Sequence, residues 1–316
     1  MKQLPVLAIV IPCYNEEEVI RETAKNLLVS IKNLIKNSQI NEKSFLLFVD
    51  DGSKDKTWSI IKELNRNYKN LRGIKLSKNC GHQNALFAGL MEAKKDADCV
   101  ISIDADLQDD IKVIPKFIEE YKAGNDIVYG VRKKRDKDSF FKKWTALFFY
   151  KLMKYLGVQI IENHADYRLA SRRALEALEK FEERNLFLRG IFPLLGFESS
   201  FVYYDRKERF AGKTKYPIKK MLSFAFEGIT SFSLVPLRVV GVIGLFVFFF
   251  SIAMILYAIE LKISGKAIPG WASTVTPIYF IGGIQLITLG IIGEYIGKTY
   301  LETKKRPRYI IEEEVK

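Results

Sequence analysis

The sequence predicts an α/β protein with a mostly parallel sheet and helices on both faces, followed by two helices that cross a membrane. Three observations lead to this prediction. Short apolar runs alternate with helical patterns over the first 230 residues, acidic residues follow several of these runs, and two long apolar segments come after them. Alternating strands and helices are typical of a parallel sheet that is covered by helices.

The individual elements follow in order from these patterns. Five apolar runs of strand length are expected to form the sheet: 6–11, 45–49, 72–76, 99–103 and 126–130. Four segments between them carry apolar residues at helical spacing: 16–36, 55–69, 82–95 and 111–122. In an open sheet of this class, ligands bind beyond the carboxyl ends of the strands. We therefore expect a binding site where these strands end.

Two apolar segments predict a membrane hairpin. Residues 234–259 and 275–297 are each longer than the roughly 20 apolar residues that a helix needs to cross a bilayer. Their connector, 260–274, is short, so both chain ends lie on one side of the membrane. Lys and Arg are frequent outside the hairpin and rare in the connector. The positive-inside rule therefore predicts a multi-pass protein of the inner or plasma membrane, with its large N-terminal part and both termini in the cytoplasm.

Two further segments combine aromatic and lysine residues at helical spacing. Residues 140–157 and 216–232 are expected to form amphipathic helices that lie in the plane of the membrane interface. For residues 140–157, the alternative is an ordinary amphipathic helix that packs on the sheet.

The composition predicts an anionic partner. The chain has 50 Lys and Arg residues against 37 Asp and Glu residues, a formal net charge of +13. Basic residues crowd next to the predicted spans, which favours membrane lipids and argues against nucleic acid. The three cysteines, Cys13, Cys80 and Cys99, are widely spaced, which favours reduced structural thiols over disulfides or a zinc site.

Acidic and polar clusters follow four of the predicted strands. They are PCYNE (12–16), DDGS (50–53), SKNCGHQNA (77–85) and DADLQDD (104–110). Like charges at the end of a buried strand repel each other unless a counterion is present. The carboxylates of Asp104 and Asp106 suit Mg²⁺ or Mn²⁺, with water and substrate phosphates completing the metal shell. Each acidic cluster alone is equally typical of a helix cap, but all of them meet at one edge of the predicted sheet.

The motifs, taken in order, resemble those of family 2 glycosyltransferases that load a sugar onto a polyprenyl phosphate. They are IVIPCYNEEEVI, FVDDGSKDKT, KNCGHQNALFAGL, IDADLQDD and HADYRLASRRAL, followed by FAGKTKYPIKKM and the two spans. The resemblance is to bactoprenol glucosyltransferases, and more distantly to dolichol-phosphate mannose synthase. It implies the Rossmann-like fold known as GT-A, a nucleotide-sugar donor and a lipid acceptor.

The resemblance also implies roles for individual residues. Five residues match the pocket for the donor nucleotide: Pro12, Tyr14, Glu16, Asp50 and Asp51. Asp104 and Asp106 match the motif that binds metal and diphosphate, which makes Asp106 a catalytic residue as well. Gln108 falls where some relatives supply a further polar contact to the metal site.

Asp166 matches an acidic position that is often proposed as the catalytic base. Two alternatives remain open for it: a structural carboxylate that pairs with Arg168 or Arg172, and a residue that positions the sugar or the acceptor. The second pKa of a phosphate monoester lies near ~6, so most of the acceptor has lost its proton at neutral pH. Strong help from a base is therefore not obligatory.

Two anionic substrates must meet, so cationic side chains are required. Six residues are expected to contact the phosphates: Arg132, Arg135, Arg168, Arg209, Lys213 and Lys215. Arg suits bidentate phosphate contact, and Lys acts as a point charge. The alternative for such residues is general attraction to anionic lipid headgroups.

These expectations combine into an inverting glycosyltransferase that moves glucose from UDP-glucose onto undecaprenyl phosphate. UDP-N-acetylhexosamine, other UDP-sugars and GDP-mannose remain alternative donors, and a non-catalytic membrane-bound nucleotide-sugar sensor is the alternative of another class. Four parts are expected: a nucleotide-sugar-binding core (1–137), an acceptor-side and membrane-interface part (138–232), two transmembrane helices (233–300) and a cytoplasmic tail (301–316). The resemblance further implies a homo-oligomer.

Overall fold

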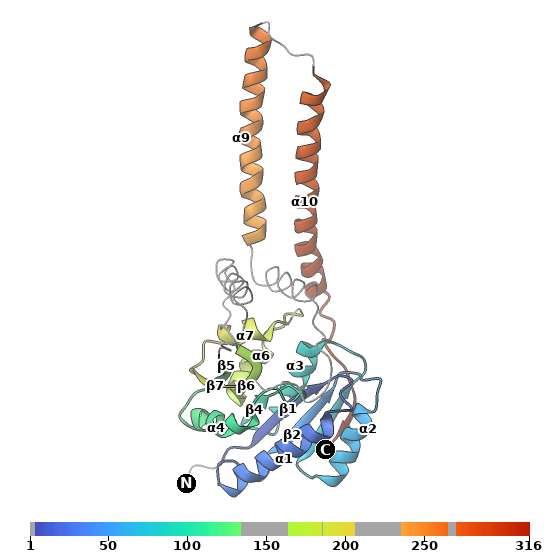
Figure 1. Cartoon of the computed structure of the whole chain (residues 1–316), viewed down its shortest axis with the longest axis vertical. Coiled ribbons are helices and arrows are strands. Elements are labelled where there is room, and N and C mark those ends of the chain that lie inside the picture. Colours follow the sequence, from blue (N-terminus) through green and yellow to red (C-terminus); the bar gives the residue numbers. More distant parts are fainter. Residues whose placement is uncertain (1–3, 134–163, 185, 206–234, 265–269) are drawn as a thin grey trace. The chain divides into compact units, whose positions relative to one another are not determined.

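The computed structural model describes residues 4–133, 164–184, 186–205, 235–264 and 270–316 (Figure 1). The chain divides into two compact units. The sheet unit comprises residues 1–150, 159–215 and 306–316, and the helical unit comprises residues 151–158 and 216–305. The predicted interfacial helices, 140–157 and 216–232, lie outside the described residues.

The sheet unit contains eight described strands in the order β7-β5-β6-β4-β1-β2-β3-β8. Their bounds are β1 Leu7–Cys13, β2 Phe45–Asp50, β3 Leu71–Leu76, β4 Cys99–Ser102, β5 Ile127–Arg132, β6 His164–Ser171, β7 Ser199–Tyr204 and β8 Ile311–Val315. Neighbours β1–β2, β1–β4, β2–β3 and β5–β7 are parallel. The pairs β4–β6, β5–β6 and β3–β8 are antiparallel. This confirms the predicted mostly parallel α/β sheet.

Helices cover both faces of this sheet (Figure 1). One face carries α1 (Ile20–Lys36), α2 (Thr57–Asn67) and α4 (Ile114–Lys122), and the other carries α3 (His82–Ala93) and α6 (Arg172–Glu179). The alternation of side chains along β1 explains this arrangement. Ile9 and Ile11 join the core formed with α1, whereas Val10 points to the opposite face and meets α3 where Gly89 leaves room. Buried apolar side chains on both faces make β1 a central strand.

Four residues of the predicted helix 16–36 belong to a turn instead. The backbone carbonyl of Glu16 accepts hydrogen bonds from the N–H groups of Val19 and Ile20, and α1 begins only at Ile20. The segment between β1 and α1 is therefore free to line the edge of the sheet.

The segment predicted as a cytoplasmic C-terminal tail, 301–316, contains regular structure. Its first residues end α10 (Trp271–Thr303), and Ile311–Val315 forms the edge strand β8 beside β3. Side chains hold the strand in place: the Trp58 indole N–H donates to Glu313 at 2.7 Å, and Lys75 pairs with Glu312 at 2.7 Å. The three consecutive glutamates of this strand suit an edge position, because charged residues discourage further strand pairing.

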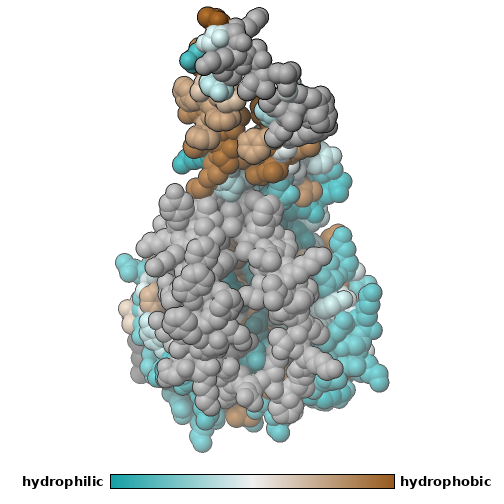
Figure 2. Space-filling view, turned by 45° about the horizontal axis from the view of Figure 1, so that its top comes forward, coloured by the Kyte–Doolittle hydropathy of each residue, from teal (hydrophilic) through white to brown (hydrophobic). Residues whose placement is uncertain are grey.

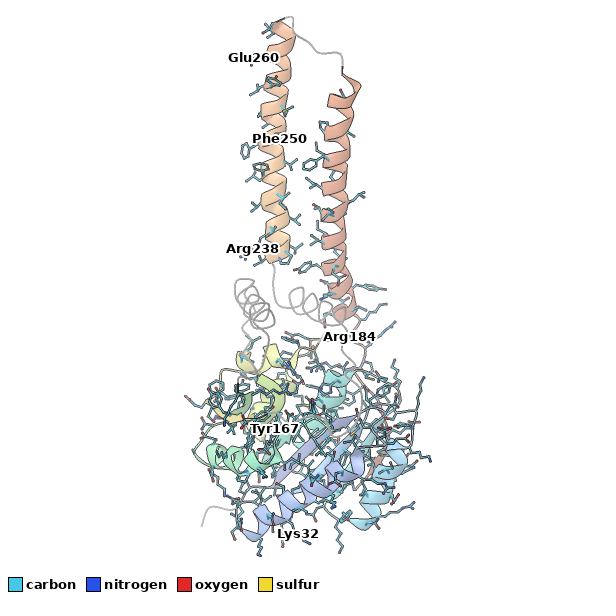
Figure 3. The ribbon with its side chains drawn as sticks, in the orientation of Figure 1. Lys32, Tyr167, Arg184, Arg238, Phe250 and Glu260 are labelled. Carbon is cyan, nitrogen blue, oxygen red and sulfur yellow. The ribbon has the colours of Figure 1, made fainter. Side chains whose placement is uncertain are left out.

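The helical unit consists, in its described part, of α9 (Val235–Ile263) and α10. The segments Val235–Met254 and Phe280–Thr303 are long and apolar enough to cross a membrane, and neither is buried inside the protein. Figure 2 shows hydrophobic side chains over the described surface of these helices, whereas the described surface of the sheet unit is mainly hydrophilic. In Figure 3, the charged residues Arg238 and Glu260 lie towards opposite ends of α9, with Phe250 between them. This distribution indicates a hairpin that associates with a membrane.

Gly52 fixes the turn after β2, and its replacement gives a first testable prediction. Its φ is +66°, and a Cβ atom there would stand 2.6 Å from the backbone carbonyl carbon of Lys78. Gly196, two residues after the end of α7 (Leu188–Leu194), has the matched φ of +67° but no atom within 4 Å of such a Cβ. Both alanine variants carry a left-handed backbone cost of about 1 kcal/mol. We expect Gly52→Ala to lower the thermal unfolding midpoint of the purified chain more than Gly196→Ala does. Equal midpoints for the two variants would contradict the prediction that the close approach of Gly52 to Lys78 contributes to stability.

Candidate active site

The turns that follow β1 and β2 are joined by hydrogen bonds to one another. The Asn15 N–H donates to Ser53 Oγ at 2.9 Å, and the Glu16 N–H donates to Thr57 Oγ1 at 2.9 Å. Asn15 adopts a φ of +53°, a conformation that Asn tolerates better than most residues. These bonds hold Tyr14, whose side chain is exposed, and Glu16 at the edge of the sheet.

Asp51 fixes a third loop at the same edge. Its two carboxylate oxygens accept hydrogen bonds from the backbone N–H groups of Cys80 at 2.7 Å and Gly81 at 3.0 Å. Burial raises the pKa of Asp51, and these two hydrogen bonds oppose the rise. The carboxylate therefore orders the loop that leads from β3 into α3.

Three of the five predicted nucleotide contacts are buried: Asp51, Asp50 and Pro12. Asp50 is fully buried: one carboxylate oxygen accepts from the Ser53 N–H at 3.3 Å, and the other has no hydrogen-bond partner among the described residues. Pro12 is buried within β1. Asp50 and Pro12 support the edge of the sheet from inside the fold, and their contact with a nucleotide stays a prediction.

Asp104 and Asp106 lie in the loop that follows β4. The hydroxyl of Thr23 in α1 donates to the carbonyl oxygen of Ala105 at 2.7 Å and anchors the loop between the two carboxylates. The Gln108 N–H donates to Asp106 Oδ1 at 3.2 Å. The loop turns back at Leu107, which has a φ of +57°. The Asp-Ala-Asp triplet is therefore held by contacts on both sides.

Topology brings Asp166 next to this loop. Ser102 of β4 pairs with Arg168 of the antiparallel strand β6, so continuation of that register sets Asp104 opposite Asp166. Burial and the neighbouring carboxylates of Asp109, Asp166 and Asp106 raise the pKa of Asp104 to about 6, although His82 opposes the rise. Burial is the main cause of this rise, and repulsion from the neighbouring carboxylates adds to it.

Asp166 is surrounded by cationic and polar side chains. Arg189 of α7 donates to both carboxylate oxygens, from Nε at 3.2 Å and from Nη2 at 3.0 Å. Arg168 Nη2 donates to Oδ1 at 2.6 Å, and Nε2 of His82 lies 3.5 Å from Oδ2. Burial alone raises the pKa of Asp166, but Arg189, His82 and Arg168 outweigh burial and hold it well below its usual range. A carboxylate with so low a pKa is a poor proton acceptor at neutral pH.

A second cluster joins Asp109 to the ends of β5 and β7. Arg132 Nη2 donates to Asp109 Oδ1 at 3.1 Å, and Arg132 Nε donates to the Tyr204 hydroxyl at 3.2 Å. The Tyr204 hydroxyl in turn donates to Asp109. Asp109 and Tyr204 are buried, whereas the Arg132 side chain is 27% exposed. The cluster orients Arg132 while leaving part of its guanidinium accessible.

The residues at this edge fit a divalent cation with substrate oxygens in its shell. No group of three or more His, Cys, Asp or Glu side chains in the described ranges is arranged to hold a metal by itself. Asp104 and Asp106 supply two hard oxygen ligands, and a bound cation would offset both the burial of Asp104 and the repulsion from its neighbouring carboxylates, which together raise its pKa. Mg²⁺ commonly uses one or two carboxylates together with water and phosphate oxygens.

Arg168 differs from its predicted role as a phosphate contact. Its side chain is 1% exposed, pairs with Asp166 and stacks on the ring of Phe192 at 4.4 Å. The pairing of Asp166 with Arg168 that the sequence left open is therefore present, whereas Arg172 pairs with Asp98. Four predicted phosphate contacts lie outside the described residues: Arg135, Arg209, Lys213 and Lys215.

The sequence did not single out several residues that the fold brings to this edge. They are His82, Gln83, Asp109, Arg189 and Tyr204. His82 and Gln83 belong to the strand-end motif SKNCGHQNA, and Asp109 belongs to the acidic run DADLQDD. These motifs could therefore have identified the three residues as members of the site. Arg189 and Tyr204 reach the site only through α7 and β7.

Comparison with known proteins is consistent with this arrangement. The profile of Glycosyl transferase family 2 matches residues 8–179, and that of the GtrB C-terminal hairpin matches residues 235–299. The uncharacterized glycosyltransferase YkoT of Bacillus subtilis is 56% identical over 99% of this chain and 93% of that protein. The prophage bactoprenol glucosyl transferase homolog of Escherichia coli is 44% identical over 96% of this chain and 98% of that protein. The bactoprenol glucosyl transferase of Shigella phage SfX is 43% identical, with the same two coverages. The chain belongs to glycosyl transferase family 2 and is a glycosyltransferase with a GtrB-type C-terminal hairpin.

Proposed function

We propose that this enzyme transfers glucose from UDP-glucose to undecaprenyl phosphate at the cytoplasmic face of the membrane. An oxygen of the acceptor phosphate attacks the anomeric carbon. The new C1–O bond forms while the bond from C1 to the donor diphosphate breaks, so UDP leaves and the anomeric configuration inverts. Relatives named bactoprenol glucosyl transferase, 42–44% identical over nearly the whole chain, support the sugar and the acceptor.

One observation carries the proposal most directly. The Asp104–Asp106 pair lies at the carboxyl end of β4, beside His82 and the cluster centred on Asp166. We infer that Asp104 and Asp106 hold Mg²⁺ or Mn²⁺, which would stabilise the negative charge on the departing diphosphate. Gln108 adds a polar contact at the same loop.

The donor nucleotide is assigned to the edge formed by the first three strands. Tyr14 and Glu16 contact the base and ribose, and Asp51 acts through the ordered loop at Cys80 and Gly81. Arg132, oriented by Asp109 and Tyr204, contacts the donor diphosphate. Arg135, Arg209, Lys213 and Lys215 are proposed to add positive charge for the two substrates.

Asp166 is proposed to position cationic groups and not to act as the base. Its contacts with Arg168, Arg189 and His82 hold it in the charged form. The acceptor is largely deprotonated at neutral pH, because the second pKa of a phosphate monoester lies near ~6. Catalysis then depends mainly on alignment of the two substrates and on neutralisation of the leaving group.

The membrane arrangement follows from the hairpin. We propose that α9 and α10 both span the bilayer, with the sheet unit and both chain termini in the cytoplasm, because Lys and Arg concentrate outside the hairpin. A membrane position gives access to an acceptor whose prenyl chain is embedded in lipid. Assembly into a homo-oligomer remains part of the proposal.

Acceptor-dependent product release tests the reaction as a whole. The purified full chain with Mg²⁺ should release UDP from UDP-glucose only when undecaprenyl phosphate is present, and radiolabelled sugar should become lipid-soluble. The same assay with UDP-N-acetylglucosamine and GDP-mannose identifies the preferred donor. UDP release without the acceptor, or no lipid-soluble label from any donor, would contradict the proposed transfer.

The Asp106→Asn variant tests the proposed metal pair. Loss of one carboxylate charge should lower kcat/KM by roughly a hundredfold or more, a size typical for loss of one group that stabilises transition-state charge. Asp96→Asn is the matched control, because Asp96 makes a surface ion pair with Arg72. The control should keep its activity, and both variants should keep the thermal midpoint of the parent. Full activity of Asp106→Asn would rule out the assignment.

The pH dependence tests whether the enzyme needs a base. Below its second pKa the acceptor phosphate gains a proton and loses nucleophilicity, so activity should fall as pH falls through about 6. The pKa of Asp166 lies well below its usual range, so Asp166 contributes no inflection there. A polyprenyl phosphonate has a higher second pKa, and with this acceptor the inflection of kcat/KM should move to higher pH. An inflection that stays fixed when the acceptor changes would assign it to a group on the enzyme.

A further inference from the structure

We infer that Arg189 binds a phosphate group of one of the two substrates, a role that the sequence motifs did not assign to it. The inference rests on the proposed function only for the identity of that substrate. Arg189 belongs to the first turn of α7 and approaches Asp166 from outside the sheet. Its side chain is 40% exposed. A ligand at the edge of the sheet can therefore reach its guanidinium.

The donor groups of Arg189 are only partly used. A guanidinium carries five N–H donors, and in the described contacts Arg189 donates from Nε and from Nη2, both to Asp166. The remaining donors include both N–H groups of Nη1. Arg168 contacts the same carboxylate, but it is 1% exposed, and it also donates to the Leu188 carbonyl and stacks on Phe192. Of these two arginines, Arg189 is the one that a ligand can contact.

Two hydrogen bonds hold the backbone next to Arg189. The Leu188 N–H donates to Gln83 Oε1 at 3.1 Å, and the Leu188 carbonyl accepts from Arg168 Nη1 at 3.3 Å. Gln83 also reaches Asp166, with its Nε2 3.5 Å from Oδ2. The bidentate contact with Asp166 then fixes the plane of the Arg189 guanidinium. A guanidinium that is already oriented loses little conformational entropy when it binds a phosphate.

Charge at this cluster favours an anion. Asp166 carries one negative charge, while Arg168 and Arg189 each carry one positive charge, so the three side chains together have a surplus of one positive charge. The nearby carboxylates of Asp104 and Asp106 are the proposed metal ligands and would be neutralised by a divalent ion. Both substrates present the matching chemistry, a diphosphate in the donor and a phosphate monoester in the acceptor. Arginine binds such groups well through parallel N–H donors.

Binding and kinetic measurements on Arg189→Gln, in the full chain with Mg²⁺, distinguish the two sources of phosphate. If Arg189 contacts the donor diphosphate, the Kd of UDP should rise by a factor of about 10 to 100, while the Kd of uridine stays unchanged. If it contacts the acceptor, the KM for undecaprenyl phosphate should rise by a similar factor, while the Kd of UDP stays unchanged. Either result supports the inference.

Matched variants separate phosphate binding from a structural role. Arg21→Gln removes a bidentate arginine–carboxylate pair on the surface, with Glu63, and should change neither constant. Arg189→Lys keeps the charge without the planar fork, and should show a smaller change than Arg189→Gln. Unchanged constants in Arg189→Gln, or equal weakening of UDP and uridine, would overturn the inference. If the parent enzyme transfers no sugar to undecaprenyl phosphate, the proposed function fails, but the comparison of UDP with uridine still tests Arg189.

Discussion

The different surroundings of two neighbouring carboxylates determine how this site is organised. Asp104 lies in the loop after β4 and Asp166 lies near the start of the adjacent strand β6, and His82 Nε2 is within 3.7 Å of both carboxylates, but the protein balances their charges differently. Asp166 receives hydrogen bonds from two arginines, which keep its pKa low. The pKa of Asp104 is instead raised to about 6, mainly by burial. When the environment separates two carboxylates in this way, their roles separate as well. The protein itself neutralises Asp166, whereas Asp104 is suited to a cation that arrives from solution.

The antiparallel strand β6 makes this contrast possible. It lies between β4 and β5, so its first residues reach the edge where those two strands end. Asp166 is near the start of β6, and Arg132 is the last residue of β5. In a purely parallel sheet, functional residues would gather only after strand ends. Here a reversed strand contributes a residue from its beginning, and α7 adds Arg189 from beyond the sheet.

Local patterns explain which parts of this arrangement the sequence could predict. The central strands and helices were predictable because apolar periodicity and strand-end acidic residues are local signals, and Asp104 and Asp106 follow directly from them. The antiparallel direction of β6 and the pairing of β8 with β3 are not local, because they depend on contacts between residues distant in the chain. Arg189 contacts Asp166 across 23 positions and lies in no strand-end motif. Arg168 is the reverse case. The sequence predicted a phosphate contact from its charge, but the fold buries its side chain beside Asp166.

The buried pair of Asp166 and Arg168 is a costly arrangement for stability, and the proposed reaction offers a reason for it. Removal of two charges from water costs free energy. A protein with apolar residues of similar volume in place of a buried ion pair is often at least as stable. Arg168 Nε also lacks a hydrogen-bond partner among the described residues, which adds to that cost. The pair nevertheless keeps a charged carboxylate in a fixed position, where it can orient Arg189 and His82 at the open edge. An apolar replacement would leave those cationic side chains without their common partner. In the proposed reaction, two substrates with several negative charges meet at this site, and positive groups that are already in place would offset the cost of the buried pair to folding.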